Sequence, residues 1–442
     1  MSSKRTTTPQ SKQIKSIHQS LQKIPFQKRA RASGFKKRKE QKLSGKTLVI
    51  SFLLMALQGN NSLQLWAEKI SGYKGIAVSK QGVWKRITRQ FVRFLEAVLF
   101  DAIRQQISSV HRQATQSGLK KRYRRILLQD STTLALPIGL RWCYPGNATN
   151  GERKSQLKLQ VIYDVLNNCF VYFEITPFTA NDQSKSKSIL HVAGSRDLVI
   201  RDLGYFSLDC FDLMKQEHIH YISRLRYGVK LKDAQTGKDI CLLQQLRTQQ
   251  RFDRWVCIGE KQQVKMRLVA LPLPEEQAGR RRHKARHDRD KRVHHSKEYY
   301  EQLGYSLYIT TESDKQFRAE QIAKVYGWRW RIESIFKCWK SQFHLQRLIS
   351  QHVSLSKERV EAIVYMLLLF IMLFQVAVYN YLIAKTTTTR SISLTKLSRY
   401  LADNIQLFFE KNLSQIAPYL LNYCTYERRH DRKNFIEKLK LG

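Results

Sequence analysis

The chain has 442 residues, of which 78 are Lys or Arg and 35 are Asp or Glu, so its net charge is +43. A hydrophobic content of 42% is enough to bury cores and excludes general disorder, and the length predicts two or three domains. The charge disfavours a neutral or basic partner and indicates a polyanion, either nucleic acid or an anionic membrane surface. Composition alone leaves a passive binding protein and an enzyme equally open.

The N-terminal region is basic and then becomes helical. Residues 1–50 hold 14 Lys or Arg and one acid, Glu40, and we expect 1–46 to be a flexible arm that binds phosphate. Residues 47–120 predict a helical DNA-binding domain, because two apolar stretches at helical spacing are followed by a glycine turn over 71–75 and a further helix from Val78. This is the pattern of a helix-turn-helix, although any small helical bundle gives the same string.

The middle of the chain changes to strand patterns. Short apolar runs occur at 126–129, 157–165, 169–176, 198–200 and 221–223, and helical patterns occur at 183–193 and 207–216. Asn167-Asn168 lies between the second and third runs and predicts a hairpin turn. We therefore expect a mixed α/β domain whose first part covers residues 121–225.

Residues 226–300 interrupt this rhythm with short strand-like pieces and a basic run from Arg280 to Lys297, which predicts an insertion. The second part of the α/β domain, 301–384, begins with a strand at Tyr305–Thr310 and continues with a long helix over about 317–343. The apolar run 362–378 is short for a membrane span and predicts a buried core helix. Residues 391–442 predict a small helical tail. The seven cysteines show no CxxC pair, which disfavours a zinc module. Their odd number, without a signal peptide, indicates a reducing, intracellular compartment.

One helix combines an acid with cations and a phenol on a single face. When each residue turns the helix by 100°, Tyr326, Arg329, Glu333 and Lys340 share a stripe of about 60°. An ordinary amphipathic helix with a solvated face gives the same pattern. A site for metal and phosphate is the alternative that this stripe leaves open.

Two aspartates strengthen the second interpretation. Asp130 and Asp202 each end a short buried strand, where open α/β sheets place their ligand-facing residues. With Glu333 they would supply three hard oxygen ligands suited to Mg²⁺ or Mn²⁺. Two such ions could activate the attacking oxygen and stabilise the leaving one in a phosphodiester displacement. Each aspartate taken alone could equally be a helix or turn cap.

The spacing of Tyr326, Arg329, Glu333 and Lys340 resembles the YREK signature of the DDE transposases of the insertion-sequence-four family. The segments that begin at Asp130 and Asp202 are similar to the first and second aspartate segments of that family, and the resemblance covers about residues 60–380. The family often has Thr-Asn before the catalytic helix, where this chain has Thr310-Thr311.

The resemblance implies an α/β fold with an RNase H-like mixed-sheet catalytic domain, a β-rich insertion, and helical regions at both ends. It implies that Asp130, Asp202 and Glu333 are catalytic and hold two ions of Mg²⁺ or Mn²⁺, and that Tyr326, Arg329 and Lys340 bind DNA phosphates. The implied partners are the double-stranded DNA of the transposon ends and the target, and a second copy of the chain in an end-paired homodimer. The implied location is the bacterial cytoplasm, at the nucleoid and without a membrane.

The implied reaction is cut-and-paste transposition, in which the 3′-OH freed at the element's end forms a hairpin and later attacks target DNA. Two alternatives remain open from the sequence. One is an inactive or domesticated sequence-specific DNA-binding protein, and the other is an RNase H-like structure-selective nuclease that does not transfer strands. Asp182 could orient the site from behind or could serve a turn.

Overall fold

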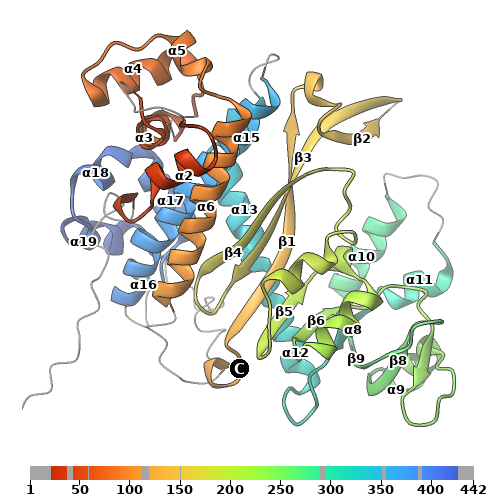
Figure 1. Ribbon diagram of the computed structural model, residues 1–442. Helices are drawn as coiled ribbons and strands as arrows, with labels where there is room; N and C mark the ends of the chain where they lie inside the picture. The colour runs from red at the N-terminus through yellow and green to blue at the C-terminus, as the bar shows by residue number, and fades with distance from the viewer. Residues whose placement is uncertain are drawn as a thin grey trace, which may run out of the picture. The chain divides into compact units, whose positions relative to one another are not determined.

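The computed structural model describes residues 21–36, 43–57, 59–110, 119–149, 151–288, 295–350, 355–386 and 391–426. Much of the predicted N-terminal arm and the last part of the predicted tail therefore lie outside the described residues. The chain divides into two compact units (Figure 1). Unit 1 contains residues 1–112, 134–156 and 335–434, and unit 2 contains residues 113–133, 157–334 and 435–442.

Unit 1 is mainly helical. Its α15 packs against α6 and α3, and the orange α6 and blue α15 lie side by side in Figure 1. The helices are α2 Phe26–Ala32, α3 Gly45–Ala56, α4 Leu63–Lys74, α5 Lys80–Trp84, α6 Arg89–Val110, α14 Leu345–Ser350, α15 Lys357–Phe374, α16 Asn380–Lys385, α17 Leu394–Asp403, α18 Ile405–Glu410 and α19 Leu413–Tyr423.

The described part of the predicted arm differs from our expectation. Residues 26–32 form α2, in which Phe26 and Ala30 are buried. Phe26 packs on Phe94 of α6, with ring centroids 6.2 Å apart, and Arg29 pairs with Asp101 of the same helix at 2.5 Å. The apolar contact and the ion pair together explain why this basic segment is folded where we expected a flexible arm.

The segment predicted as a helix-turn-helix consists of α4, a turn and α5. Gly75 ends α4 in the left-handed conformation at φ 66°, which glycine adopts without a steric penalty. α5 begins with a Ser79 cap but ends at Trp84, so it is shorter than the helix we expected. Trp84 is 59% exposed at its end.

The apolar helix predicted over 362–378 is a core helix of unit 1. Residues Lys357–Lys385 are long and apolar enough to cross a membrane by length and composition alone, but 94% of their most apolar window is buried inside the structure. Burial on all sides is what distinguishes the core helix of a large protein from an amphipathic surface helix.

A ten-stranded sheet runs in the order β2-β3-β1-β5-β6-β10-β9-β8-β7, with β4 paired to β3. β4 and β3 form the predicted hairpin, and β5 and β6 run parallel to β1. The order β4-β3-β1-β5-β6 is the RNase H-like arrangement. The strands are β1 Arg125–Leu136, β2 Pro145–Thr149, β3 Glu152–Asp164, β4 Cys169–Pro177, β5 Asp197–Arg201, β6 His220–Arg224, β7 Leu231–Asp233, β8 Phe252–Ile258, β9 Val264–Pro272 and β10 Tyr305–Thr310.

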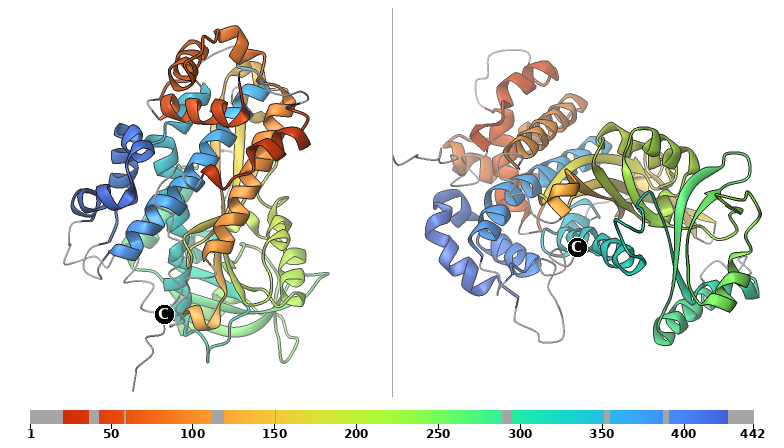
Figure 2. Two further views of the ribbon diagram at one scale, coloured as in Figure 1. Left: turned by 60° about the vertical axis from the view of Figure 1, so that its left-hand side comes forward. Right: turned by 90° about the horizontal axis from the view of Figure 1, so that it is seen from below.

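The predicted insertion, 226–300, contributes strands to this same sheet. β9 pairs antiparallel with β10, and β8 and β7 follow outward, as the green strands in Figure 2 show. The region also contains α9 Leu242–Gln249, α10 Glu275–Arg286 and α11 Lys297–Gln302. Part of the basic run is therefore helical, in α10.

Helices cover both faces of the central strands of unit 2. On β6, Tyr221 packs against Phe211 of α8 (Leu208–Gln216), while Arg224 lies over Tyr326 of α12 (Ala319–Tyr326). Residues of opposite parity on a strand point to opposite faces, so α8 and α12 lie on opposite faces of the sheet. The long helix expected over 317–343 is interrupted: α12 is followed by a 3₁₀ turn, η4 Gly327–Arg329, and then by α13 Trp330–Ser341.

Candidate active site

The two predicted aspartates lie at the same level of neighbouring strands, Asp130 within β1 and Asp202 directly after β5. β1 and β5 are parallel, and Gln129 of β1 is paired in register with Arg201 of β5. Asp130 directly follows Gln129, and Asp202 directly follows Arg201. Parallel pairing therefore brings these carboxylates together at the C-terminal end of β5. The prediction that a strand ends at Asp130 is wrong, because β1 continues past the β5 pairing to Leu136.

The helix after β10 brings the predicted phenol and cation to these acids. The Tyr326 hydroxyl donates a hydrogen bond to Asp202 Oδ1 at 3.3 Å. The 3₁₀ turn η4 follows Tyr326 and ends at Arg329. Side chains three residues apart in a 3₁₀ helix lie directly above one another. Arg329 accordingly lies over the Tyr326 ring, 6.0 Å from its centroid, and both side chains face the strand ends.

Arg329 contacts all three predicted acidic residues. Its Nη1 lies 2.6 Å from Glu333 Oε1 and 3.3 Å from Asp130 Oδ2, and its Nε lies 3.9 Å from Asp202 Oδ1. One guanidinium thus joins carboxylates from β1, the end of β5 and α13. Sequence reasoning predicted these residues but placed Arg329 on phosphate and did not anticipate its pairing with the acids.

This arrangement bears on the expected metal site. Within the described ranges, no group of three His, Cys, Asp or Glu side chains lies close enough to hold a metal ion as the side chains stand. The donor chemistry nevertheless fits a divalent cation, because three carboxylates already surround one positive group and carry more negative charge than it neutralises.

Asp130 has a raised pKa, and burial is the main cause. Its pKa is raised to about 7, mainly by burial and to a smaller extent by the charges of Asp202 and Glu333, against the opposing effects of the Ser131 N–H and Arg329. Burial by itself lowers the pKa of Arg329, but the surrounding carboxylates outweigh it and raise the pKa overall. The guanidinium is therefore charged at any working pH.

Asp182 lies behind the site and is more than a turn residue. Its Oδ1 accepts hydrogen bonds from Ser131 Oγ at 3.0 Å, Lys158 Nζ at 3.1 Å and Gln160 Nε2 at 3.0 Å. The backbone N–H of Ser131 in turn donates to Asp130 Oδ1 at 2.8 Å.

The same carboxylate explains Gly204, two residues after Asp202. A Cβ at Gly204 would lie 3.3 Å from Asp182 Oδ2, which is tighter than ordinary contact. Asp182 is therefore in contact with both aspartate segments.

Basic side chains lie close to the helical part of the site. Arg224 of β6 lies over the rings of Tyr308 and Tyr326, at 4.8 and 5.1 Å. Arg281, in the basic run on α10, donates to the Tyr305 carbonyl at 3.1 Å. Burial and the charge of Arg224 lower the pKa of Arg281, so these cations are close enough to repel each other.

The fourth residue of the signature and a neighbouring tryptophan are on α13. Lys340 lies seven residues beyond Glu333, on the same helical face, in the part of α13 that belongs to unit 1. Burial of part of its side chain lowers its pKa. Trp330 follows Arg329 and is 63% exposed, with the guanidinium 5.5 Å from its ring centroid. Sequence reasoning did not single out Trp330.

A sequence profile of the family described as Transposase DDE domain matches residues 122–373, which is more than half of the chain. The chain belongs to the DDE transposase family. It is accordingly a DDE transposase, an enzyme that acts on DNA. The matched range begins before β1 and ends near the C-terminus of α15, so it includes all three acids.

Relatives of this DDE transposase occur in several bacteria. The transposase of insertion sequence element IS231D from Bacillus thuringiensis subsp. finitimus is 29% identical over 434 residues, covering 92% of this chain and 89% of that protein. The transposase of IS1151 from Clostridium perfringens is 24% identical, covering 61% of this chain and 60% of its own length. A piggyBac transposase synaptic complex with hairpin DNA aligns with a TM-score of 0.43 and 10% identity, over 94% of this chain and 84% of that one.

Proposed function

We propose that the chain is the transposase of a bacterial insertion sequence, which binds the inverted-repeat ends of its element and moves it by cut-and-paste. Asp130, Asp202 and Glu333 are the metal ligands in this proposal. The observation that carries it is the meeting of these three carboxylates, from β1, the end of β5 and α13, on one guanidinium. Two Mg²⁺ or Mn²⁺ ions would activate the attacking oxygen and stabilise the leaving one in phosphodiester displacement.

The protein's own residues have distinct parts in this reaction. Bound cations would replace Arg329 as the positive charge among the carboxylates, so we propose that it moves from the acids to a phosphate of the transposon end when cations and DNA bind. Tyr326 orients Asp202 through its hydroxyl at 3.3 Å. Lys340, on the same helical face as Glu333, would bind a second phosphate as a point charge.

The partners follow from the reaction and the charge. A net charge of +43 favours DNA through release of the counterions condensed on it. Joining two ends of one element requires both to be held together, so we propose a homodimer that binds two transposon ends and then target DNA. This work would take place on nucleoid DNA in the bacterial cytoplasm.

The test is Glu333→Ala, with Glu320→Gln as a control at an exposed residue of the preceding helix that pairs with Arg251. We expect Glu333→Ala to abolish cleavage of a transposon-end duplex in Mg²⁺ and to leave DNA binding within about twofold, because the substitution removes a metal ligand and leaves the phosphate-binding residues in place. Glu320→Gln is expected to cleave as the wild type does. Equal cleavage by Glu333→Ala would overturn the assignment of the acids.

A second assay separates transposition from simple nuclease action. Pre-cut ends with a free 3′-OH and a supercoiled target plasmid are given to the wild-type protein with Mg²⁺. Joined products support a transposase that transfers strands. Cleavage without joining would support a structure-selective nuclease, and binding without either reaction would support an inactive DNA-binding protein.

A further inference from the structure

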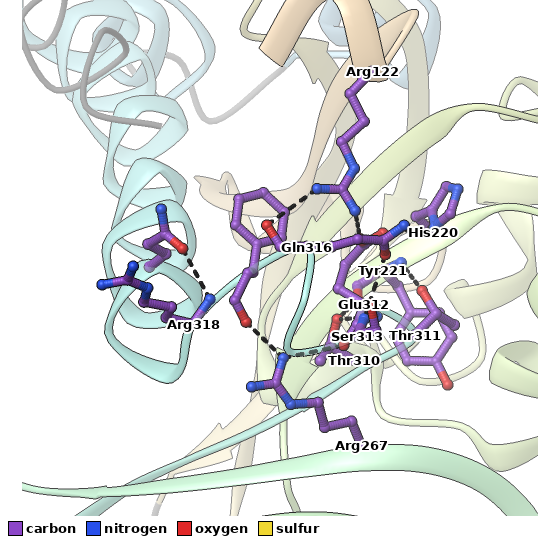
Figure 3. Close-up of polar contacts among 12 residues, drawn as sticks. Arg122, His220, Tyr221, Arg267, Thr310, Thr311, Glu312, Ser313, Gln316 and Arg318 are labelled. Atoms are coloured by element: carbon purple, nitrogen blue, oxygen red, sulfur yellow. Dashed lines mark hydrogen bonds and ion pairs between the residues drawn. The ribbon is translucent and has the colours of Figure 1, made fainter. Parts of the chain in front are cut away.

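A fully buried carboxylate follows β10. It lies at the opposite end of the central strands from the acids of the candidate site. Glu312 is 0% exposed. Its Oε2 lies 2.6 Å from Arg122 Nη2, and its Oε1 lies 2.6 Å from His220 Nδ1 (Figure 3). Burying a charge is costly unless it is paired on all sides, so this carboxylate requires both partners.

The residues on either side of Glu312 are fixed to β6. Thr310 Oγ1 donates to the Tyr221 carbonyl at 2.7 Å, and the Tyr221 N–H donates to Thr311 Oγ1 at 3.1 Å. The Glu312 N–H then donates to Thr310 Oγ1 at 3.0 Å. The end of β10 is thus joined to β6 by side chains after the strand pairing has stopped.

Two arginines fix the loop that follows. Buried Arg267 of β9 donates to the carbonyls of Glu312 at 3.2 Å and Phe317 at 2.7 Å, and pairs with Asp253. Arg122 donates to the Gln316 carbonyl at 3.2 Å and lies 5.0 Å from the centroid of the Phe317 ring. Figure 3 shows these groups converging on the loop between β10 and α12.

The partners of Glu312 come from the elements that carry the site. Arg122 lies three residues before β1, which bears Asp130, and His220 begins β6, the neighbour of the strand that leads to Asp202. Because β10 runs antiparallel to β6, it ends where β1 and β6 begin. The chain must then return along α12 and η4 to bring Glu333 to the acids.

We infer that Glu312 is a positioning residue for the reaction. Its carboxylate, bound by Arg122 and His220, fixes the start of α12 against β1 and β6. Since each helical residue advances the chain by 1.5 Å, that starting point sets how far Glu333 reaches toward Asp130 and Asp202. The inference rests on the proposed function of these three acids.

The test compares Glu312→Gln with the exposed control Glu320→Gln in the full-length protein. The glutamine keeps the size of the side chain but has no negative charge to pair with Arg122. We expect Mn²⁺ affinity without DNA, measured by electron paramagnetic resonance, to weaken about tenfold or more, and kcat for end cleavage to fall by roughly 10- to 100-fold. DNA affinity should fall much less than Mn²⁺ affinity, because Arg329 and Lys340 are retained and supply only a small part of the positive charge of the chain. Measurements are made well below the unfolding temperature of each variant.

His220→Gln provides a second variant at a residue that is 35% exposed at its side chain and tolerates substitution more readily. We expect the same pattern with a smaller effect, and a double variant no worse than Glu312→Gln, because the two residues act through one contact. If Glu312→Gln fails to fold, His220→Gln decides the outcome.

The inference is overturned if the variants unfold at lower temperature yet keep wild-type Mn²⁺ affinity and kcat, which is the result of a purely structural role. Glu333→Gln, measured in parallel, separates this failure from that of the proposed function. Normal metal binding and cleavage by Glu333→Gln would refute the assignment of the acids. Defective Glu333→Gln with normal Glu312→Gln would refute only the positioning role.

Discussion

The two carboxylate clusters of unit 2 differ in the number of carboxylates that share one guanidinium. At one end of the central strands, three carboxylates share the single guanidinium of Arg329, namely those of Asp130, Asp202 and Glu333. At the other end of these strands, the single carboxylate of Glu312 contacts both Arg122 and His220. The first cluster has excess negative charge and is partly open, while the carboxylate of the second is closed to solvent and paired with the guanidinium of Arg122. The unbalanced negative charge of the first cluster indicates a site for an incoming cation. The paired charge of the second indicates a structural role.

The largest expected effect comes from removing the cation of the closed cluster. Arg122→Gln should lower the free energy of unfolding by about 3–5 kcal/mol, because it leaves a buried carboxylate short of a partner. Mn²⁺ should not restore this loss. Calorimetry with and without Mn²⁺ measures it, and Arg251→Gln, from an exposed pair with Glu320, should cost less than about 1 kcal/mol. If Mn²⁺ restored the stability of Arg122→Gln, the proposed difference between the two clusters would be wrong.

Removing the cation of the open cluster should cause a loss of stability that Mn²⁺ does restore. Arg329→Gln is expected to raise Mn²⁺ affinity in the absence of DNA by roughly tenfold, because one competing positive charge is gone. The thermal stability that the variant loses should return when Mn²⁺ is added. Electron paramagnetic resonance measures the affinity, with Lys337→Gln on the same helix as the control. Unchanged or weaker binding would mean that Arg329 does not compete with the cation.

The raised pKa of Asp130 predicts a pH dependence for the open cluster. Its folded pKa of about 7 is above the ordinary value of 3.8, mainly because of burial, so below pH 7 a proton occupies a proposed metal ligand. Mn²⁺ affinity should therefore fall by up to about tenfold per pH unit below 7 and level off above it. The metal-free protein should correspondingly lose stability from this group as pH rises from about 4 to 7. Titrations between pH 5.5 and 8.5 would contradict this if the affinity were constant.

The smallest effect concerns the basic run beside the open cluster. Exposed Lys284 and Arg286 lie on α10, the helix from which Arg281 reaches the end of the sheet near Tyr326. Lys284→Glu with Arg286→Glu should flatten the salt dependence of DNA affinity by about one unit of log–log slope for each phosphate that the protein no longer neutralises. Lys230→Gln, at an exposed residue paired with Glu260, should leave the slope unchanged. An unchanged slope in the double variant would place α10 away from the DNA.

The local features of the fold were predictable from the sequence. The hairpin around Asn168, the strand Tyr305–Thr310 and the helix after Phe206 follow from alternating or continuous apolar runs with turn residues at their ends. The same reasoning correctly put Asp202 after the end of a buried strand, but it was wrong to end the first strand at Asp130, because β1 continues to Leu136. Parallel pairing of β1 with β5 still makes the two aspartates neighbours. Their catalytic role remains a prediction.

The contacts between distant segments were not predictable in this way. Arg122 and Glu312 are 190 residues apart, and nothing local in either segment indicates the other. Helical periodicity also did not predict the 3₁₀ turn η4, which interrupts the expected helix between α12 and α13. α2 was likewise hidden by its basic composition, because burial of Phe26 on α6 decides its fold.

The pairing of β9 with β10 limits how this chain can be shortened. The segment 226–300 interrupts the α/β pattern, but its strand β9 covers the whole length of β10, from Tyr305 to Thr310. Excising the segment would leave β10 as an unprotected edge strand made mostly of buried residues, which is a template for aggregation. The segment therefore cannot be treated as a removable module, and a minimal catalytic core of this protein must retain at least β9.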